Sequence, residues 1–552
     1  MKNYHIQGPQ IHQFNNVQAR SIPRSMFKRD YTRRMTFNQD VLVPIMIDEV
    51  LPGDDINIKM TAFCRMSTPI KPLMDNLYLE TFWFFVPNRL VWDNWEKFQG
   101  QQTNPSDSVA FTIPKLNPAQ APISTTGFLE ETLADYFGLP TRVTALDNIS
   151  ALPFRAYELI WNDWFRDESL QNSQTVPKGD GPDDPSIYTL LKRNKRKDYF
   201  TSCLPWPQKG AEISITFGGT AQVRGTGKTL GIMGAATGGG AIITAGLVSN
   251  GGTIVQRGAD YDTNIGQNSV GAATMTSTIG LTTDGTKSGV VADLSTATPI
   301  SINTLRQAAL YQQILELDAR GGTRYVESIY SRFGVVSPDF RLQRPELIGQ
   351  GSTRINIYAV PQTSASPATP TSTNAQGNMA AYGTAAIQGD HGCRYSATEH
   401  GMLIALANVR ADLTYQQGIP RMFTRRTRLD FYEPLLNGLG EQTVLNREIF
   451  AQGTAADLNV FGYQERFSEY RYRNSEICGK FRSNAAGTLN IWHLSQQFGA
   501  LPALNSSFIE EAVPMARVLA VNTEPSFLMD SHFSYTHVRP MPIRSNPGID
   551  RL

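Results

Sequence analysis

The ten residues from Leu77 to Val86, Leu-Tyr-Leu-Glu-Thr-Phe-Trp-Phe-Phe-Val, form an almost continuous apolar and aromatic run that ends at Pro87. A β-strand buried on both faces has this composition. Earlier in the chain, residues 56–60 (Ile-Asn-Ile-Lys-Met) alternate apolar and polar side chains, which is the period of a strand with one buried face. The Pro52-Gly53 pair is a turn signal between the first runs. We therefore expect residues 41–90 to consist mainly of β-strands.

The strand signal returns in the second half of the chain. Residues 402–407 form a short apolar run, and residues 461–473 alternate aromatic side chains with charged ones. Short strands at irregular spacing, separated by long excursions, favour an antiparallel sandwich over a parallel α/β sheet. We expect one scaffold rather than several independent domains. Its strands should include residues near 41–47, 56–64, 77–86, 402–409 and 461–472.

Two helices are expected to interrupt these strands. Residues 151–170 place Pro153 in a first turn and carry apolar and aromatic residues at helical spacing on one face. Residues 304–320 repeat the apolar spacing and stop at Gly321-Gly322. Helices are thus expected to be exceptions in a chain that otherwise consists of strands and turns.

Composition divides the chain into four segments. Residues 1–40 hold seven lysines and arginines and only two acids, and no strand or helix period runs through them, so we expect a basic extended arm. Residues 41–210, with helical excursions, and residues 301–552, with a C-terminal extension, should form the scaffold. Residues 211–300 carry 18 of the 45 glycines, which predicts a weakly cored surface insertion. A second stretch of small residues, 362–388, predicts a surface loop.

Net charge and cysteine usage exclude several broad roles. The formal net charge of +1 implies no bulk attraction to nucleic acid or to a membrane, so local clusters must carry any such role. The four cysteines are widely scattered without a CxxC pair, which argues against a zinc ribbon or a redox motif. The stretch 232–248 is mostly small or apolar, but glycines interrupt it and a membrane span needs about 20 predominantly apolar residues. We therefore expect no membrane insertion.

Three basic clusters place several cations close to aromatic side chains, the combination that binds phosphates and stacks on bases. The first lies in the arm, the second is Lys192 to Lys197, and the third surrounds Phe423. The alternative for each cluster is a solvated face or a set of ion pairs between subunits. The residues expected to face nucleic acid are Arg20, Arg24, Lys28, Arg29, Arg33, Arg34, Arg425, Arg426 and Arg428.

Three short patterns suggest chemistry but lack the context that it needs. Gly225 to Thr229 is similar to the end of a phosphate-binding loop, but Gln222 occupies the position of the first required glycine. Residues 390–400 hold Asp, His, Cys and Glu at spacings that match no metal motif. Residues 530–537 hold Asp, Ser and His without a nucleophile elbow, and triads are not built from adjacent residues. We expect no catalytic residue, no cofactor and no metal ligand.

Several long motifs follow one another in an order typical of one viral family. They are Phe84 to Trp95 (Phe-Phe-Val-Pro-Asn-Arg-Leu-Val-Trp-Asp-Asn-Trp), Leu152 to Asp167, Leu204 to Gly210, Glu399 to Gly401, Phe461 to Arg466 and Ser534 to Pro542. On these motifs the chain closely resembles the major capsid proteins of the Microviridae, the small single-stranded DNA phages, in their gokushovirus branch. The resemblance covers most of the chain except 211–300 and 362–388.

The resemblance implies a mainly β fold, an eight-stranded antiparallel jelly roll with long loops and a few helices. It implies a T=1 icosahedral shell of about 60 copies around circular single-stranded DNA, with 211–300 forming protrusions at the threefold axes for host attachment. The implied partners are further copies of the chain, the DNA genome, a DNA pilot protein, an internal scaffolding protein, a small DNA-binding protein and a host surface receptor such as a glycan. The protein would reside in the virion after assembly in the bacterial cytoplasm.

A jelly-roll phage adhesin that binds or cleaves glycans is the alternative. It would need a cleft with paired carboxylates or a cluster of exposed aromatic residues. Residues 211–300, with two aromatic and five acidic residues, are a poor candidate for that site. A low charge content of 18% suits a subunit with large contacts to its neighbours. We expect an exposed aromatic helix over 153–170 and the segment Pro540 to Pro547 to supply that contact surface.

Overall fold

The computed structural model describes residues 23–211, 213, 302–363 and 376–544, together with six short strands between residues 212 and 301. The chain forms two compact units. The first joins Met1–Lys209 to Glu316–Leu552, and the second is Gly210–Leu315.

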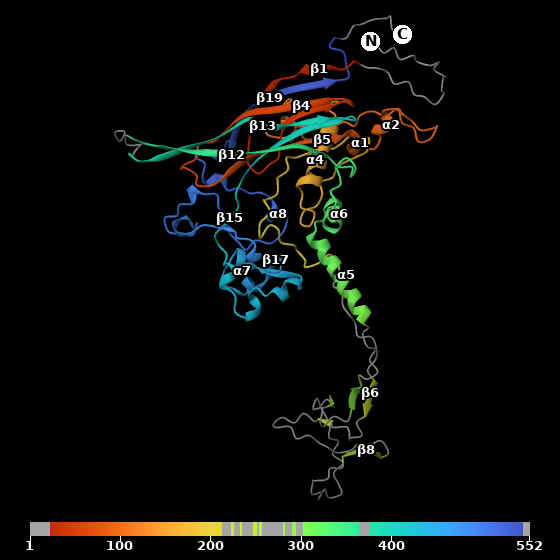
Figure 1. Cartoon of the computed structure of the whole chain (residues 1–552), viewed down its shortest axis with the longest axis vertical. Helices are drawn as coiled ribbons and strands as arrows, with labels where there is room; N and C mark the ends of the chain where they lie inside the picture. Colours follow the sequence, from red (N-terminus) through yellow and green to blue (C-terminus); the bar gives the residue numbers. More distant parts are fainter. Residues whose placement is uncertain are drawn as a thin grey trace, which may run out of the picture. The chain divides into compact units, whose positions relative to one another are not determined.

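A large curled antiparallel sheet dominates the first unit (Figure 1). Across the sheet the order is β1-β19-β4-β13-β12-β5-β14-β3, and β2 also pairs with β19. The mainly β, jelly-roll-like fold class is confirmed, although among the described residues this sheet has nine strands where we expected eight. The strands are β1 Ser25–Lys28, β2 Tyr31–Phe37, β3 Val43–Val50, β4 Asp55–Met66, β5 Leu77–Pro87, β12 Glu346–Pro361, β13 Met379–Ser396, β14 Gly401–Ala411 and β19 Phe527–Arg539.

Two hydrophobic clusters explain the burial patterns of these strands. In β4 the inward side chains, such as Ile58, are buried and the outward ones, such as Lys59, are exposed, because a core lies on one side only. In β5, by contrast, both sides are buried. Trp83 belongs to the cluster enclosed by the curled sheet, and its neighbour Phe84 belongs to a second cluster on the other face. The prediction of a doubly buried strand over 77–86 is therefore confirmed.

Helix α4 covers this second face of β5 and β14. Its Tyr157 and Ile160 are fully buried in the second cluster, and the helix continues as a π-helical turn, Trp161–Phe165. The expectation of an exposed contact helix over 153–170 is wrong, because its aromatic side chains complete a core within the subunit. The helices are α1 Asn88–Val91, α2 Trp95–Phe98, α3 Leu133–Tyr136, α4 Leu152–Ile160, α5 Ile302–Arg320, α6 Tyr325–Phe333, α7 Asn446–Ile449 and α8 Ser506–Ile509.

Strands β1 and β2 form one edge of the sheet within the predicted arm. Both pair with β19 in a single register, from Ser25 opposite Arg539 to Phe37 opposite Phe527. The expectation that residues 1–40 carry no strand is therefore wrong for 25–37. The strand period was hidden because Arg33 occupies an inward position that an apolar residue would normally fill.

Strand β13 occupies part of the stretch 362–388 that we expected to be a surface loop. Residues 379–388 belong to β13, which pairs with β4 and β12, whereas 364–375 lie outside the described residues. A Cβ atom on Gly383 would lie 2.9 Å from Cδ1 of Ile357 and 3.1 Å from Met66. The small residues of 379–388 therefore reflect close strand packing and not a loop.

A smaller lobe surrounds a third cluster, which includes Tyr199, Phe200 and Phe461. Here β17 (Val460–Glu465) pairs with β16 (Glu441–Leu445) in a separate two-stranded sheet. The prediction that 461–472 is a strand of the main sheet is wrong, because the strand ends at Glu465 and Phe467 adopts a φ of 62°. The remaining strands are β6 Gln222–Gly225, β7 Ile232–Met233, β8 Leu247–Asn250, β9 Thr253–Gln256, β10 Gly280–Leu281, β11 Val290–Asp293, β15 Thr414–Tyr415 and β18 Ser475–Glu476.

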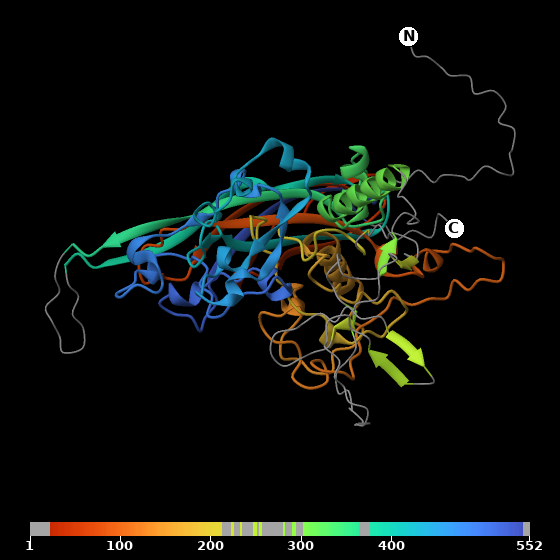
Figure 2. The same ribbon diagram turned by 90° about the horizontal axis from the view of Figure 1, so that it is seen from below.

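The lobe and the main sheet share one unit (Figure 2). In the described part of the chain, no helix has both the length and the apolar character to cross a bilayer. Of the predicted apolar stretch 232–248, only β7 and the first residues of β8 lie among the described residues.

Candidate nucleic-acid and assembly surfaces

Two of the predicted arginines of the arm have partners within the subunit. Arg29 pairs with Asp48, donating from Nη2 to Oδ1 at 3.1 Å, and its guanidinium carbon lies 5.1 Å from the ring centroid of Tyr535. Arg33 donates to two backbone carbonyl oxygens, one of them that of Ile45 at 3.1 Å, and burial lowers its pKa. Both side chains thus fasten the edge strand to the rest of the unit.

The other arm residues point outward or lie outside the described part. Arg34 has 82% of its side chain exposed, and its Nε lies 3.6 Å from Oδ2 of Asp530, which is itself 54% exposed. Lys28 is exposed at the end of β1. Arg24 is exposed and donates to a backbone carbonyl oxygen at 2.6 Å. Arg20 lies outside the described residues. Lys28 and Arg34 are therefore accessible to a ligand.

The third basic cluster is similarly divided. Arg425 is 10% exposed, donates to Oε1 of Glu469 at 3.0 Å, and lies 4.3 Å from the ring centroid of Tyr470. Arg426 and Arg428 are exposed. The structure thus brings one of the three predicted arginines into a structural ion pair and leaves two on the surface.

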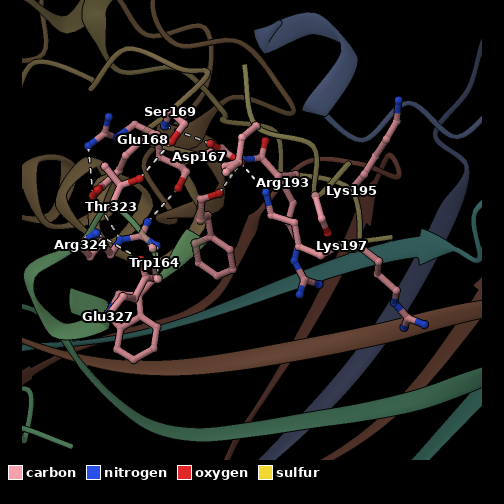
Figure 3. A pocket seen from close by; sticks show the side chains of 18 of the residues that line it. Trp164, Asp167, Glu168, Ser169, Arg193, Lys195, Lys197, Thr323, Arg324 and Glu327 are labelled. Carbon is pink, nitrogen blue, oxygen red and sulfur yellow. Dashed lines mark hydrogen bonds and ion pairs between the residues drawn. The ribbon is translucent and has the colours of Figure 1, made fainter. Parts of the chain in front are cut away.

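The second basic cluster lines a cavity of about 830 Å³ (Figure 3). Three of its cations have acidic partners, and Nζ of Lys195 donates to the backbone carbonyl oxygen of Phe508 at 2.6 Å. Arg193 and Arg196 both pair with Glu80 of β5, and Lys197 pairs with Asp167. Ion pairs, here within one subunit, therefore describe this cluster better than an open phosphate site.

The opposite wall of the cavity shows the same balance of charge. The guanidinium of Arg324 lies 3.3 Å from a carboxylate oxygen of Glu168 and 3.5 Å from one of Glu327, and Figure 3 shows the three side chains together. Ser169 and Thr323 join their hydroxyl groups at 3.0 Å nearby. Most of the charged side chains that line the cavity are thus paired, and these pairs hold its walls in place.

Two buried acids lie behind the second basic cluster. Asp40 accepts hydrogen bonds from the backbone N–H of Val513 at 3.1 and 3.2 Å. Burial, together with the charge of Glu511, raises the pKa of Asp40 to about 7, and burial raises the pKa of Glu511 to about 7 as well. The two carboxyl groups titrate near neutrality at a junction between separate parts of the chain.

Large apolar side chains lie on the surface in two segments. After α5, in which only Ala319 is buried, residues 325–340 expose Tyr325, Tyr330, Phe333, Val335, Val336 and Phe340. Residues 422–439 expose Met422, Phe423, Leu429, Phe431, Tyr432, Leu435 and Leu439, with Leu435 at 89%. Exposed apolar surface of this extent is typical of a protein that binds a partner. We name these segments apolar segment A (325–340) and apolar segment B (422–439).

Sequence reasoning missed both apolar segments. An apolar run in a sequence predicts a buried segment, and only the structure shows whether other elements cover it. The signal in segment B was the mixture of three arginines, Pro434 and Gly438 with Leu and Phe, a composition that suits short 3₁₀ turns better than a buried strand.

The histidines of the patterns that suggested chemistry have polar partners within the fold. His391, in β13, lies between Thr81 and Thr353, with ring nitrogens 2.8 and 2.9 Å from the two hydroxyl oxygens. His537 is buried, and its Nε2 lies 2.9 Å from Oδ2 of Asp54. Gly225 belongs to β6, whereas 226–229 lie outside the described residues.

A curled antiparallel sheet, a cavity with paired charges and exposed apolar segments are features of a protein that contacts partners. Comparison with known proteins makes the class specific. Residues 15–549 match the family model described as "Capsid protein (F protein)", and the chain belongs to this family of structural, non-enzymatic viral capsid proteins. The recognition of a Microviridae capsid protein is confirmed.

Three curated relatives share nearly their whole length with this chain, and each is named capsid protein VP1. That of Bdellovibrio phage phiMH2K is 47% identical over 533 residues, which are 96% of both chains. That of Chlamydia phage 1 is 39% identical over 599 residues, and that of Spiroplasma virus 4 is 36% identical over 564 residues, each covering 98% of both chains. The chain is thus a phage capsid protein of the virion.

Proposed function

We propose that the protein self-assembles, as about 60 identical copies with icosahedral symmetry, into a shell that encloses circular single-stranded DNA. The observation that carries this proposal is the pair of exposed apolar segments A and B, which a lone subunit leaves in water. Contacts between identical copies would bury them. Assembly would take place in the host bacterial cytoplasm, together with a DNA pilot protein, an internal scaffolding protein and a small DNA-binding protein.

The test is the size of the particle formed with these viral partners. Electron microscopy and sizing chromatography should show closed megadalton shells that contain single-stranded DNA. Small soluble oligomers in the presence of all partners would contradict the proposal, and would instead agree with an adhesin.

The residues that would meet DNA are the exposed cations Lys28, Arg34, Arg426 and Arg428, with Arg20 and Arg24 in or beside the part of the arm that precedes β1. Arg29, Arg33 and Arg425 were also predicted to face DNA, but each has a partner within the subunit. We therefore propose that these three arginines mainly stabilise the folded subunit. Arg34→Gln should lower DNA content per particle while Arg29→Gln lowers particle yield, and the reverse outcome would contradict this division.

Host attachment is proposed for the insertion 211–300, projecting around a threefold axis and contacting a surface receptor such as a glycan. Its glycine content supports this role, since a segment with little core tolerates the sequence change that receptor recognition demands. Deleting 225–295 should leave shells intact and abolish adsorption to the host. Loss of shells with a correctly folded remainder would show that the segment is structural instead.

A further inference from the structure

The described residues leave one face of the sheet uncovered. The strands β2, β19, β4 and β13 bury their inward side chains in the first cluster, and their outward side chains are exposed along most of their length. In Figure 1, β19, β4 and β13 lie in the upper part of the first unit, and α4, α6 and the lobe with β15 and β17 lie below them. The uncovered face is therefore available to a ligand that spreads along a surface.

Many outward side chains of this face are small, polar or cationic, few are carboxylates, and Phe63 and Leu528 add exposed apolar surface. The cations are Lys28, Arg34, Lys59, Arg65 and Arg394, and the carboxylates on the same strands are Asp55, Asp390 and Asp530. Cations thus exceed acids on a protein that is almost neutral overall. A negatively charged partner fits such a face better than an apolar one.

The strand register brings an aromatic ring and two arginines together on this face. Arg34 of β2 lies opposite Asp530 of β19, and Asp530 lies opposite Phe63 of β4. Arg65 lies two residues further along β4, on the same face as Phe63. Adjacent strands are about 4.8 Å apart and residues i and i+2 are about 7 Å apart. The two guanidinium groups and the ring are therefore within reach of a single nucleotide.

A pocket of about 550 Å³ lies where these side chains meet. Phe63 is 52% exposed and Leu528 is 48% exposed, so the pocket offers apolar surface to a planar group. It is lined by Arg33, Arg34, Met35, Thr36, Phe63, Arg65, Asp135, Tyr136, Leu528, Met529 and Asp530. A phenylalanine at an outward strand position gains nothing from the core, and a stacking partner would explain it.

The cationic side chains of the pocket differ in how strongly they interact with other groups of the subunit. Arg33 is occupied by the carbonyl oxygens of Ile45 and Tyr136. Arg34 has a contact of 3.6 Å to Asp530 with both groups exposed, a type of ion pair that contributes little. Among the described residues, Arg65 has no ion pair. Arg34 and Arg65 can therefore bind a phosphate group with little loss of interactions within the subunit.

We propose that this pocket binds one nucleotide of single-stranded DNA, with the base stacked on Phe63 and the adjoining phosphate between Arg34 and Arg65. Guanidinium groups form paired, charge-assisted hydrogen bonds with phosphate oxygens, and base stacking on aromatic rings is tolerant of sequence. A binding mode without sequence preference suits a surface repeated on every copy. The inference rests on the proposed enclosure of single-stranded DNA and names the surface that takes it.

Two kinds of substitution separate the two contacts. In particles made with the viral partners, Arg34→Gln combined with Arg65→Gln should lower DNA retention after a salt wash and flatten its salt dependence, by a slope of up to about 0.7 per lost phosphate contact. Phe63→Ala should lower retention several-fold with the slope unchanged, because stacking releases no counterion. Phe63→Trp should restore retention.

Matched controls lie away from the pocket. Arg473→Gln removes an arginine that is 89% exposed, and Tyr472→Ala removes the aromatic residue before it in the chain, which is 51% exposed. Neither should change DNA retention. Ultraviolet cross-linking of unaltered particles, followed by mass spectrometry, should place a nucleotide on the peptide that contains Phe63.

Four results would contradict these proposals. Unchanged retention with intact shells, or a cross-linking map without this peptide, overturns the nucleotide pocket. Collapsing particle yield with unchanged DNA per particle overturns it too, and assigns the face to a neighbouring copy. If unaltered particles hold no DNA, the proposed function itself fails, which is seen before any variant is made.

Discussion

Arg155 of α4 and Asp183 form a two-pronged ion pair in which both side chains are almost completely buried. Nε to Oδ2 and Nη2 to Oδ1 are each 2.7 Å, and the side chains are 0% and 2% exposed. Nη1 also donates to the carbonyl oxygen of Val91 at 3.1 Å, and the hydroxyl of Tyr188 donates to Asp183 at 2.6 Å. The pair therefore joins α4 to two other parts of the chain.

Breaking this pair should be costly. Asp183→Asn leaves the guanidinium buried without its counter-charge, and we expect a loss of about 3–5 kcal/mol. The free energy of unfolding of the purified protein measures it. Glu130→Gln is the control, because its pair with Arg142 lies on the surface with side chains 51% and 70% exposed and should contribute little. Equal effects of the two changes would show that burial does not determine the value of the pair.

The buried acids Asp40 and Glu511 predict a pH dependence. Their pKa values are raised to about 7, above the values near 3.9 and 4.3 of an unfolded chain. The folded state therefore holds more protons than the unfolded state between about pH 4 and pH 7, and stability falls as pH rises through that window. The combined change Asp40→Asn and Glu511→Gln should flatten this part of a plot of melting temperature against pH. An unchanged slope would contradict the assignment.

Gly401 should tolerate no side chain. A Cβ atom there would lie 2.6 Å from the ring of Phe85 and 2.6 Å from the carbonyl oxygen of Val86. Gly401→Ala should destabilise the subunit by about 1–3 kcal/mol through overpacking. Gly438→Ala is the control, because a Cβ atom at Gly438 meets nothing within 4 Å. Thermal unfolding of the two variants gives the comparison.

Apolar segment B should matter for assembly and not for folding. Leu435 is 89% exposed, so Leu435→Ser removes no core contact and the melting temperature of the unassembled subunit should be unchanged. Shell yield should fall, because the apolar area would be buried only between copies. Asn437→Ser serves as the control, since it leaves the apolar side chains in place. Normal shell yield for Leu435→Ser would remove this residue from the contact surface.

Sequence patterns predicted the strands that obey a simple burial rule. β4 alternates and β5 is buried throughout, and both were expected from their side chains. Two kinds of strand were missed. In β2 a hydrogen-bonded arginine, Arg33, takes an inward position and hides the period. In β13 small residues such as Gly383 allow close packing and read as a loop.

The candidate site was harder to predict than the fold, because the sequence does not show which residue a charged side chain pairs with. Arg29, Arg34 and Arg425 belong to similar basic runs, yet only Arg34 is largely exposed. Their acidic partners Asp48 and Glu469 are set by strand register and by turns far along the chain. Likewise, Phe63 reads as one more strand residue until the alternation of β4 places it outward.

The position of β19 has a consequence for how the chain is made. β19 pairs with β1, β2 and β4, so the latest strand of the sheet to be synthesised lies between the earliest ones. During synthesis, the backbone N–H and C=O groups on that side of β4 remain without strand partners until residues 527–539 have left the ribosome. Unpaired strand edges are prone to join the wrong chain. Synthesis is therefore the period in which this protein most needs a chaperone, and a prematurely terminated chain cannot close its own sheet.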